Sequence, residues 1–193
     1  MATEGNEVEI KFRVKSLKAL SEALRSAGFR VKTKRTHEMN TLYDFPNGDL
    51  RQRGEVLRLR KYGRVWTFTH KGAGEPGKHK SRKETETEVS NGEKLNDVLL
   101  SIGLHPRFRY EKFRTEWTKG KGDVVVDETP IGNFGEIEGP AEWIDSVAKK
   151  LGITEEAYIT KSYSELFLEW KGETGRIATE MTWAAVRAKD HSS

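Results

Sequence analysis

Charged and hydrophobic residues alternate along the segment Asn6-Glu-Val-Glu-Ile-Lys-Phe-Arg-Val14. In a β-strand, successive side chains point to opposite faces, so the hydrophobic residues would share one face and the charged residues the other. The charged face comprises Glu7, Glu9, Lys11 and Arg13. Two carboxylates beside a lysine could hold a divalent cation together with an anionic group, or they could simply face solvent on the outside of a sheet.

The composition limits the class of protein. The chain has 193 residues, of which 35% are hydrophobic, so one core and one domain are expected. Lysine and arginine (34) slightly outnumber aspartate and glutamate (30), an excess that suits a small anionic ligand but does not require nucleic acid. The absence of cysteine excludes disulfides, a thiolate nucleophile and a zinc–thiolate site. No apolar run approaches a membrane span, so we expect a cytoplasmic protein without a membrane partner.

Periodicity predicts an α+β fold with more strands than helices. Helical spacing and capping residues occur at 16–27, 90–102, 140–151 and 162–168. Alternation and β-forming residues predict strands at 6–14, 34–44, 55–62, 64–71, 79–89, 107–118, 123–128 and 133–139. This pattern is typical of a mostly antiparallel α+β domain, as an open sheet or a closed barrel. Residues 172–193 lack a firm pattern apart from a weak helical segment at 181–186.

Charged residues also share one face in several later strands. Acids are concentrated on the first, fifth and last predicted strands, and bases on the third and sixth. For any single strand, an ordinary solvent-exposed face is the simplest interpretation. Taken together, the strands could instead line a wet lumen, in which a ligand and metal ions would compensate the charges. Alternation does not decide which face is inside.

These residues resemble the motifs of the CYTH superfamily, the triphosphate tunnel metalloenzymes. Glu7-Val-Glu-Ile-Lys11 is similar to the family's ExExK signature, and further motifs follow in family order. They are Asn40-Thr-Leu-Tyr-Asp-Phe-Pro46, Val56-Leu-Arg-Leu-Arg60, Thr69-His-Lys-Gly72, Lys112-Phe-Arg114, Val126-Asp-Glu128, Gly135-Glu-Ile-Glu-Gly139 and Lys161-Ser-Tyr-Ser-Glu-Leu166. The resemblance implies an eight-stranded antiparallel β-barrel with flanking helices, with the charged face inside. It implies a CYTH domain over residues 1–170, followed by a weakly structured tail at 171–193.

The resemblance also implies roles for individual residues. One or two Mg²⁺ or Mn²⁺ ions would be ligated by Glu7, Glu9, Asp127, Glu136 and Glu138. The phosphates would be bound by Lys11, Arg58, Arg60, Lys71, Arg82, Lys112 and Arg114. Glu84 and Glu86 would support the site, and Lys11 and Lys161 would orient or activate the nucleophile. A lysine acts as a base only where its pKa is lowered, which neighbouring cations could achieve.

We therefore expect a metal-dependent triphosphatase that hydrolyses inorganic triphosphate or an organic triphosphate such as thiamine triphosphate. The first alternative is a class IV adenylate cyclase, which would convert ATP to cyclic AMP and pyrophosphate in the same lumen. A further alternative is a barrel that binds polyphosphate or RNA without turnover. The expected partner is a small triphosphate, nucleic acid is not expected, and both a monomer and a homodimer remain open. Tyr43 and Asp44 could either close a strand end or reach the site.

Overall fold

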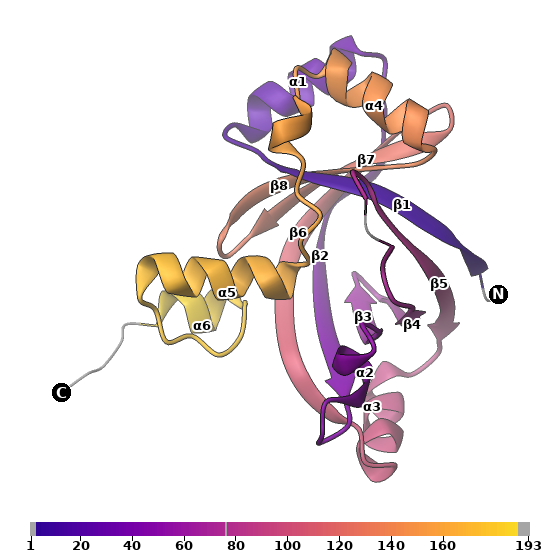
Figure 1. Cartoon of the computed structure of the whole chain (residues 1–193), viewed down its shortest axis with the longest axis vertical. Helices are drawn as coiled ribbons and strands as arrows, with labels where there is room; N and C mark the ends of the chain where they lie inside the picture. The colour runs from indigo at the N-terminus through magenta and orange to yellow at the C-terminus, as the bar shows by residue number, and fades with distance from the viewer. Residues whose placement is uncertain (1–2, 76, 189–193) are drawn as a thin grey trace.

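The computed structural model describes residues 3–75 and 77–188 and contains a closed antiparallel β-barrel (Figure 1). Neighbouring strands follow the order β1-β5-β4-β3-β2-β6-β7-β8, and β8 pairs with β1 to close the barrel. Their bounds are β1 Thr3–Arg13, β2 Arg30–Asp44, β3 Val56–Tyr62, β4 Val65–Lys71, β5 Lys80–Val89, β6 His105–Lys119, β7 Gly122–Thr129 and β8 Gly132–Glu138. The expected α+β class and the eight-stranded barrel are confirmed.

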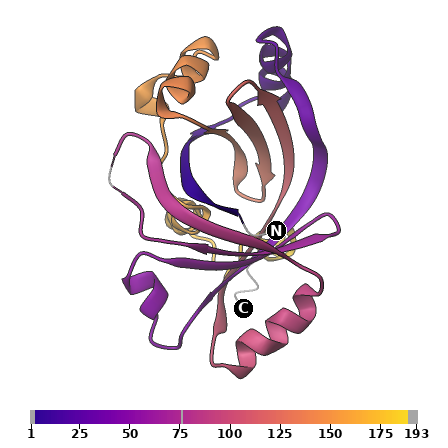
Figure 2. The same ribbon diagram turned by 90° about the vertical axis from the view of Figure 1, so that its right-hand side faces the viewer.

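Helices occupy the two ends and one side of the barrel. They are α1 Leu17–Ser26, α2 Asp49–Gln52, α3 Gly92–Ser101, α4 Ala141–Lys150, α5 Tyr163–Thr174 and α6 Trp183–Arg187, with a 3₁₀ turn at Glu155–Ala157. The Ser16 side chain caps α1 and the Asn91 side chain caps α3, so α3 begins two residues after the start of the predicted segment 90–102. Figure 2 shows α1 (purple) and α4 (orange) at one end of the barrel and α3 (pink) at the other.

The hydrophobic faces of the strands point outward and are covered by these helices. Ile10 of β1, Val124 of β7 and Ile137 of β8 are fully buried in a cluster with Leu24 of α1 and Ile144 of α4. A second cluster packs the outward residues of β3 and β4 against α3. Because side chains alternate along a strand, covering the hydrophobic face from outside leaves the charged face pointing into the barrel.

The close fit of β1 against β8 depends on a glycine. Gly135 pairs with Phe12 across these strands, and a Cβ atom at position 135 would lie 2.1 Å from the Phe12 ring. Any side chain there would force the two strands apart. The pairing of Phe12 with Gly135 therefore fixes the register of the two strands. Lys11 and Arg13, the residues directly before and after Phe12, then point to the opposite face of β1.

The segment after residue 170 differs from the expected weakly structured tail. Helix α5 continues to Thr174 and ends at Gly175, whose φ of 69° suits a glycine C-cap. Met181 is fully buried: its backbone N–H donates to the Arg109 carbonyl, and its carbonyl accepts from the Glu111 N–H. The backbone pairing with β6 explains why sequence periodicity underestimates the order here. Residues 189–193 lie outside the described residues.

In the described part of the chain, no helix is long and apolar enough to cross a lipid bilayer.

Candidate functional site

A cavity of about 280 Å³ occupies the barrel interior, and most of the side chains that line it are charged. Nine are basic and eight are acidic, with a few apolar and hydroxyl side chains between them. The basic side chains are Lys11, Lys32, Arg58, Arg60, Lys71, Lys80, Arg82, Lys112 and Arg114. The acidic ones are Glu7, Glu9, Glu84, Glu86, Glu116, Asp123, Glu136 and Glu138. A more open groove of about 610 Å³ shares Glu7, Asp123 and Glu138 with this cavity.

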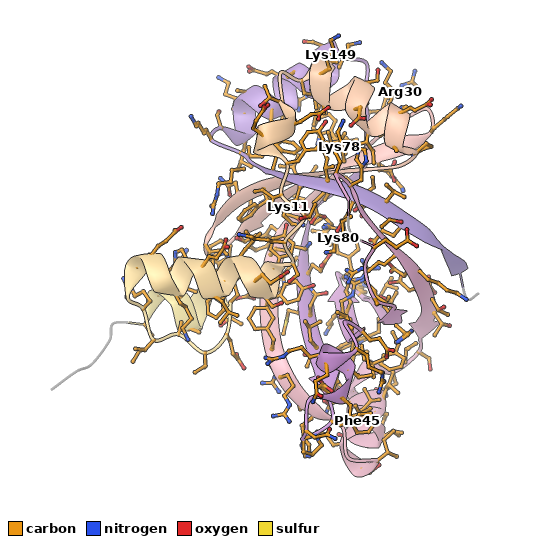
Figure 3. All side chains as sticks on the ribbon, viewed as in Figure 1. Lys11, Arg30, Phe45, Lys78, Lys80 and Lys149 are labelled. Carbon is orange, nitrogen blue, oxygen red and sulfur yellow. The ribbon has the colours of Figure 1, made fainter. Side chains whose placement is uncertain are left out.

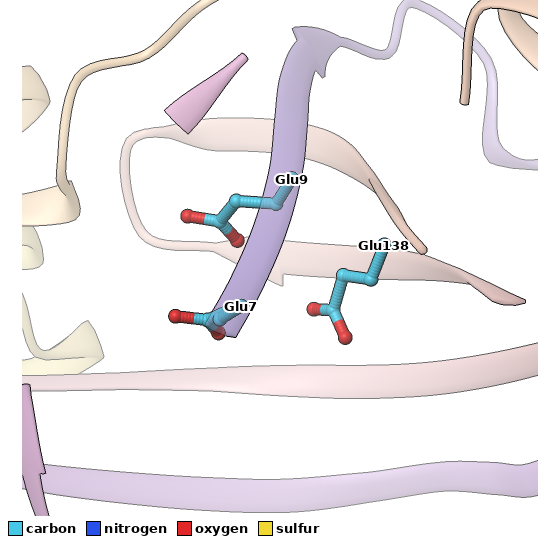
Figure 4. A group of neighbouring side chains, drawn as sticks. All are labelled: Glu7, Glu9 and Glu138. Carbon is cyan, nitrogen blue, oxygen red and sulfur yellow. The ribbon is translucent and has the colours of Figure 1, made fainter. Parts of the chain in front are cut away.

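Three carboxylates meet on one wall of the cavity. Glu7 and Glu9 project from β1 and Glu138 from the adjacent β8, as Figure 4 shows. Each offers a carboxylate oxygen within 4.8 Å of the other two. Burial, together with the charges of Glu136, Glu9 and Glu7, raises the pKa of Glu138 to about 8. An all-oxygen donor set with this excess of negative charge fits a hard divalent cation such as Mg²⁺ or Mn²⁺.

The other two predicted metal ligands, Asp127 and Glu136, are engaged by basic side chains instead. Asp127 is fully buried and accepts hydrogen bonds from Lys112 Nζ at 2.7 Å and Arg114 Nε at 2.8 Å. Glu136 pairs with Lys11 Nζ at 2.9 Å and with Arg114. Burial would raise the pKa of Glu136, but Lys11 and Arg114 outweigh it and hold the pKa well below the ordinary value. The structure thus separates the predicted ligand set into a cluster of three carboxylates, Glu7, Glu9 and Glu138, and two acids outside the cluster that pair with lysine and arginine.

The predicted phosphate-binding residues all line the cavity, and acids hold several of them in place. Lys71 Nζ lies 2.7 Å from both Glu7 and Glu84. Arg60 donates to Glu86 at 2.9 Å, and Arg58 Nη2 lies 3.4 Å from the same carboxylate. The predicted supporting role of Glu84 and Glu86 is consistent with these contacts, although their part in a reaction stays a prediction.

The lysines of the cavity differ in their electrostatics. Burial would lower the pKa of Lys11, but the carboxylates of Glu136 and Glu9 outweigh it, so the pKa is raised. Lys11 therefore remains an ammonium ion, suited to binding anions rather than to accepting a proton. Burial lowers the pKa of Lys80, and the charges of Arg82, Lys11 and Lys71 lower it further. Figure 3 shows Lys11 and Lys80 both in the barrel region.

Lys161 is not brought into the cavity. Its side chain is 52% exposed and pairs with Glu169 two turns along α5. The chain turns at Ser162, the N-cap of α5, and places Ser162, Tyr163 and Ser164 on the cavity side. The predicted catalytic role of Lys161 therefore has no geometric support.

The sequence left the role of Tyr43 and Asp44 open. In the structure, both side chains form hydrogen bonds that hold the end of β2. The Tyr43 hydroxyl donates to Asn96 of α3 at 2.6 Å. Asp44 Oδ1 accepts from the backbone N–H groups of Phe45 and Leu50 at 2.8 and 2.9 Å. Asp44 thus anchors the turn that leads from β2 into α2, and Tyr43 joins the same strand end to α3.

Sequence reasoning missed several residues of the site, including Lys32, Glu116 and Asp123 of the cavity lining and three that contact predicted site residues. Lys80 lies 3.3 Å from Glu9 and could have been found, because it shares the alternating face of Arg82. Glu38 of β2 is fully buried, accepts from Asn40 and lies 3.5 Å from Lys112 Nζ. Tyr163 donates to Asp127 at 2.7 Å, and no periodicity marks it because it comes from a helix that reaches the barrel from outside.

The fold and the cavity define a class of protein: an antiparallel β-barrel whose interior is a cavity lined by acids and bases. A model of the CYTH domain matches residues 5–163. The chain therefore belongs to the CYTH domain family.

Several known proteins resemble this chain in sequence or in fold. The chain is 26% identical over 171 residues to a Methanocaldococcus jannaschii protein named Putative adenylate cyclase MJ0240, covering 83% of this chain and 97% of that protein. The PH1819 protein of Pyrococcus horikoshii superposes with a TM-score of 0.74 at 24% identity, over 84% of this chain and 98% of that chain. HpAC1 of Hippeastrum, described as a putative adenylyl cyclase with a dominant triphosphatase activity, gives 0.57 at 21% identity, over 84% and 95%. At these identities, the two structures show the fold alone.

Proposed function

We propose that this protein is a metal-dependent triphosphatase that hydrolyses inorganic triphosphate or a related organic triphosphate inside the barrel. One observation carries the proposal: among the described residues, one cavity holds nine basic side chains together with a cluster of three carboxylates. A polyphosphate needs several cationic groups, and its metal ion needs oxygen ligands. The cavity supplies both kinds of group.

The lysine–carboxylate ion pairs of the cavity could be replaced by contacts of the lysines with phosphate and of the carboxylates with a metal ion. Lys71 is held by Glu7, and Lys80 lies beside Glu9, so each pair joins a candidate metal ligand to a candidate phosphate ligand. A metal ion at the carboxylates would release the lysines, and phosphate oxygens would then take the place of the carboxylates. Such an exchange compensates both charges and avoids leaving a buried ion unpaired.

Different residues of the cavity would bind the metal ion and the phosphates. Mg²⁺ or Mn²⁺ would be held by Glu7, Glu9 and Glu138 and would supply charge neutralisation at the phosphate oxygens. The phosphates would be bound by Arg58, Arg60, Lys71, Lys112 and Arg114, which all line the cavity. Water attacks the terminal phosphorus, the bridging P–O bond breaks, and the proton of the water passes to solvent. Inorganic triphosphate then gives orthophosphate and pyrophosphate, and an organic triphosphate gives orthophosphate and the organic diphosphate. Because phosphoryl transfer depends mainly on positioning and charge stabilisation, a set of fixed cations is the catalyst that it requires.

Adenylate cyclase is the second candidate, because the Methanocaldococcus jannaschii relative bears that name. In that reaction the ribose 3′-hydroxyl attacks the α-phosphorus and pyrophosphate leaves. A purine would need an apolar or aromatic pocket beside the phosphate groups. The cavity lining is mostly charged: its aliphatic members are Leu42, Val56 and Val125, and its aromatic members are Tyr110 and Tyr163. The two rings contact each other, and Lys11 and Lys112 lie against Tyr163, so the surroundings of these rings are cationic rather than apolar, which favours the triphosphatase.

The test is a product analysis with two substrates. The protein is incubated with inorganic triphosphate and with ATP, each with Mg²⁺ and with Mn²⁺, and phosphate, pyrophosphate and cyclic AMP are measured. Phosphate from triphosphate without cyclic AMP is the expected result. Cyclic AMP with pyrophosphate from ATP would replace the proposal by the cyclase, and binding without products would indicate a non-catalytic barrel.

The Glu138→Gln variant tests the metal cluster, because it removes one charged ligand at nearly constant volume. We expect it to lower metal-dependent turnover by a factor of about 10–100, the scale at which support of a metal site is lost. Glu169→Gln is the matched control, since Glu169 lies outside the cavity and pairs with Lys161. Equal activity of the two variants would contradict the ligand set.

A further inference from the structure

Helix α5 contributes an aromatic side chain to a cavity that is otherwise built from strands. Tyr163, the first residue of α5, is 7% exposed and lines the cavity together with Ser162 and Ser164. The C-terminal motif therefore enters the site through Tyr163 rather than through Lys161.

Tyr163 contacts two of the predicted phosphate-binding lysines at once. Lys11 Nζ lies 4.8 Å from the centroid of its ring, and Lys112 Nζ lies 4.7 Å from it. These lysines come from β1 and β6, which are not neighbours in the barrel. An ammonium group within about 6 Å of an aromatic face is attracted by the ring quadrupole, most strongly where water is excluded. One ring thus connects two walls of the cavity.

The hydroxyl group fixes the ring in place. It donates to Asp127 Oδ2 at 2.7 Å, and the ring packs edge-on against Phe134 with centroids 5.7 Å apart. Burial raises the pKa of Tyr163 well above its ordinary value, and the charges of Asp127 and Glu136 add to this effect. The phenol therefore stays protonated and remains a donor to Asp127.

An aromatic face holds a lysine without neutralising it. A carboxylate beside an ammonium group cancels its charge and competes with an incoming phosphate, whereas a ring orients the ammonium group and leaves its full charge for the anion. Lys11 and Lys112 each have such a carboxylate, Glu136 and Asp127 respectively. The ring would keep both ammonium groups in position when phosphate oxygens replace these partners.

We propose that Tyr163 is a positioning residue that holds the ammonium groups of Lys11 and Lys112 toward a bound polyphosphate. The inference rests on the proposed function for the identity of the anion. It gives α5 a part in substrate binding, because the docking of this helix sets the position of the ring.

Binding calorimetry with inorganic triphosphate and Mg²⁺ tests the proposal. Tyr163→Leu removes the ring, and we expect its Kd to be about tenfold higher or more, since two ring–cation contacts are lost. Tyr163→Phe retains the ring and should bind within about threefold of wild type. Phe167→Leu is the matched control: Phe167 is buried in the same helix and packs against Phe108 and Trp170, outside the cavity. An unchanged Kd for Tyr163→Leu, or a change equal to that of Phe167→Leu, overturns the proposal.

A second measurement does not depend on the anion. In lysine-labelled protein, the ring current of Tyr163 should displace the ε-methylene NMR signals of Lys11 and Lys112, assigned through the Lys11→Arg and Lys112→Arg variants. The displacement should persist in Tyr163→Phe and disappear in Tyr163→Leu, and signals that do not move overturn the proposal. Wild-type protein that binds triphosphate without hydrolysing it contradicts the triphosphatase while leaving both tests of Tyr163 decisive.

Discussion

The five acids predicted to bind metal fall into two groups that differ in their contacts. Glu7, Glu9 and Glu138 form an acidic cluster, whereas Glu136 and Asp127 lie outside it and pair with lysine and arginine side chains. All five are acids at alternating positions of their strands, so sequence spacing treats them alike. Their neighbours distinguish them: burial and nearby carboxylates raise the pKa of Glu138 to about 8, whereas Lys11 and Arg114 outweigh burial and hold the pKa of Glu136 well below its ordinary value.

The two lysines predicted to be catalytic should respond differently to substitution. Lys161→Ala removes an exposed ion pair with Glu169, and such pairs contribute about 0–1 kcal/mol, so triphosphate turnover should stay within about twofold of wild type. Lys11→Met removes a buried ammonium group and leaves Glu136 without its partner, so turnover should fall by a factor of about 100 or more. Steady-state kinetics of both variants checks the contrast. A large loss in Lys161→Ala would mean that its side chain reaches the cavity in the working protein.

The residues that sequence reasoning missed share a physical reason. Alternation shows which side chains share a face of a strand. It therefore grouped Arg58 with Arg60 on one strand, and Glu136 with Glu138 on another. It does not find Tyr163, because the orientation of α5 depends on how its hydrophobic side packs against the barrel. Nor does alternation state which face is inside. That expectation came from the family resemblance, and the structure explains it by the helices that cover the outward hydrophobic side chains.

At the scale of elements, the short helix α2 depends on one carboxylate. Asp44 accepts three backbone N–H groups, from Phe45, Leu50 and Arg51, with distances of 2.8, 2.9 and 3.1 Å. Burial would raise the pKa of Asp44, but these donors outweigh it and lower the pKa below the ordinary value of 3.8. The charged form is thus the one that the folded protein stabilises.

This linkage predicts a pH dependence of stability. Because the pKa of Asp44 is lower in the folded than in the unfolded chain, its contribution is complete above about pH 4 and is lost as the pH falls through the folded-state pKa. Asp44→Asn should lower the free energy of unfolding by about 1–3 kcal/mol at pH 7, and by much less near pH 3. Urea unfolding at both pH values measures this. Asp97→Asn, at an exposed position of α3, should show no such difference; a loss for Asp44→Asn that is equal at both pH values would contradict the linkage.

At the scale of the whole molecule, the barrel encloses many charged side chains, and a ligand can compensate their charges. Its wall is stabilised from outside, where helices α1, α3 and α4 cover hydrophobic side chains. Its interior combines nine bases with eight acids, and each buried charge loses hydration that its ion pairs only partly replace. A ligand that compensates both signs should therefore stabilise the fold as well as occupy the cavity.

Thermal unfolding should reveal this coupling as a shift that requires metal and anion together. At a free ligand concentration of about 100 times Kd, binding contributes about 2.7 kcal/mol, which for a chain of this size corresponds to roughly 5–10 °C in Tm. Triphosphate without Mg²⁺ should give a smaller shift, because the carboxylates of Glu7 and Glu9 repel it. In Glu138→Gln the difference between the two conditions should shrink, since one ligand of the cation is lost and metal adds less to the shift. Equal shifts with and without metal in the wild-type protein would mean that the acidic cluster does not bind a cation beside the anion, and the cavity would then act as a polyanion-binding barrel.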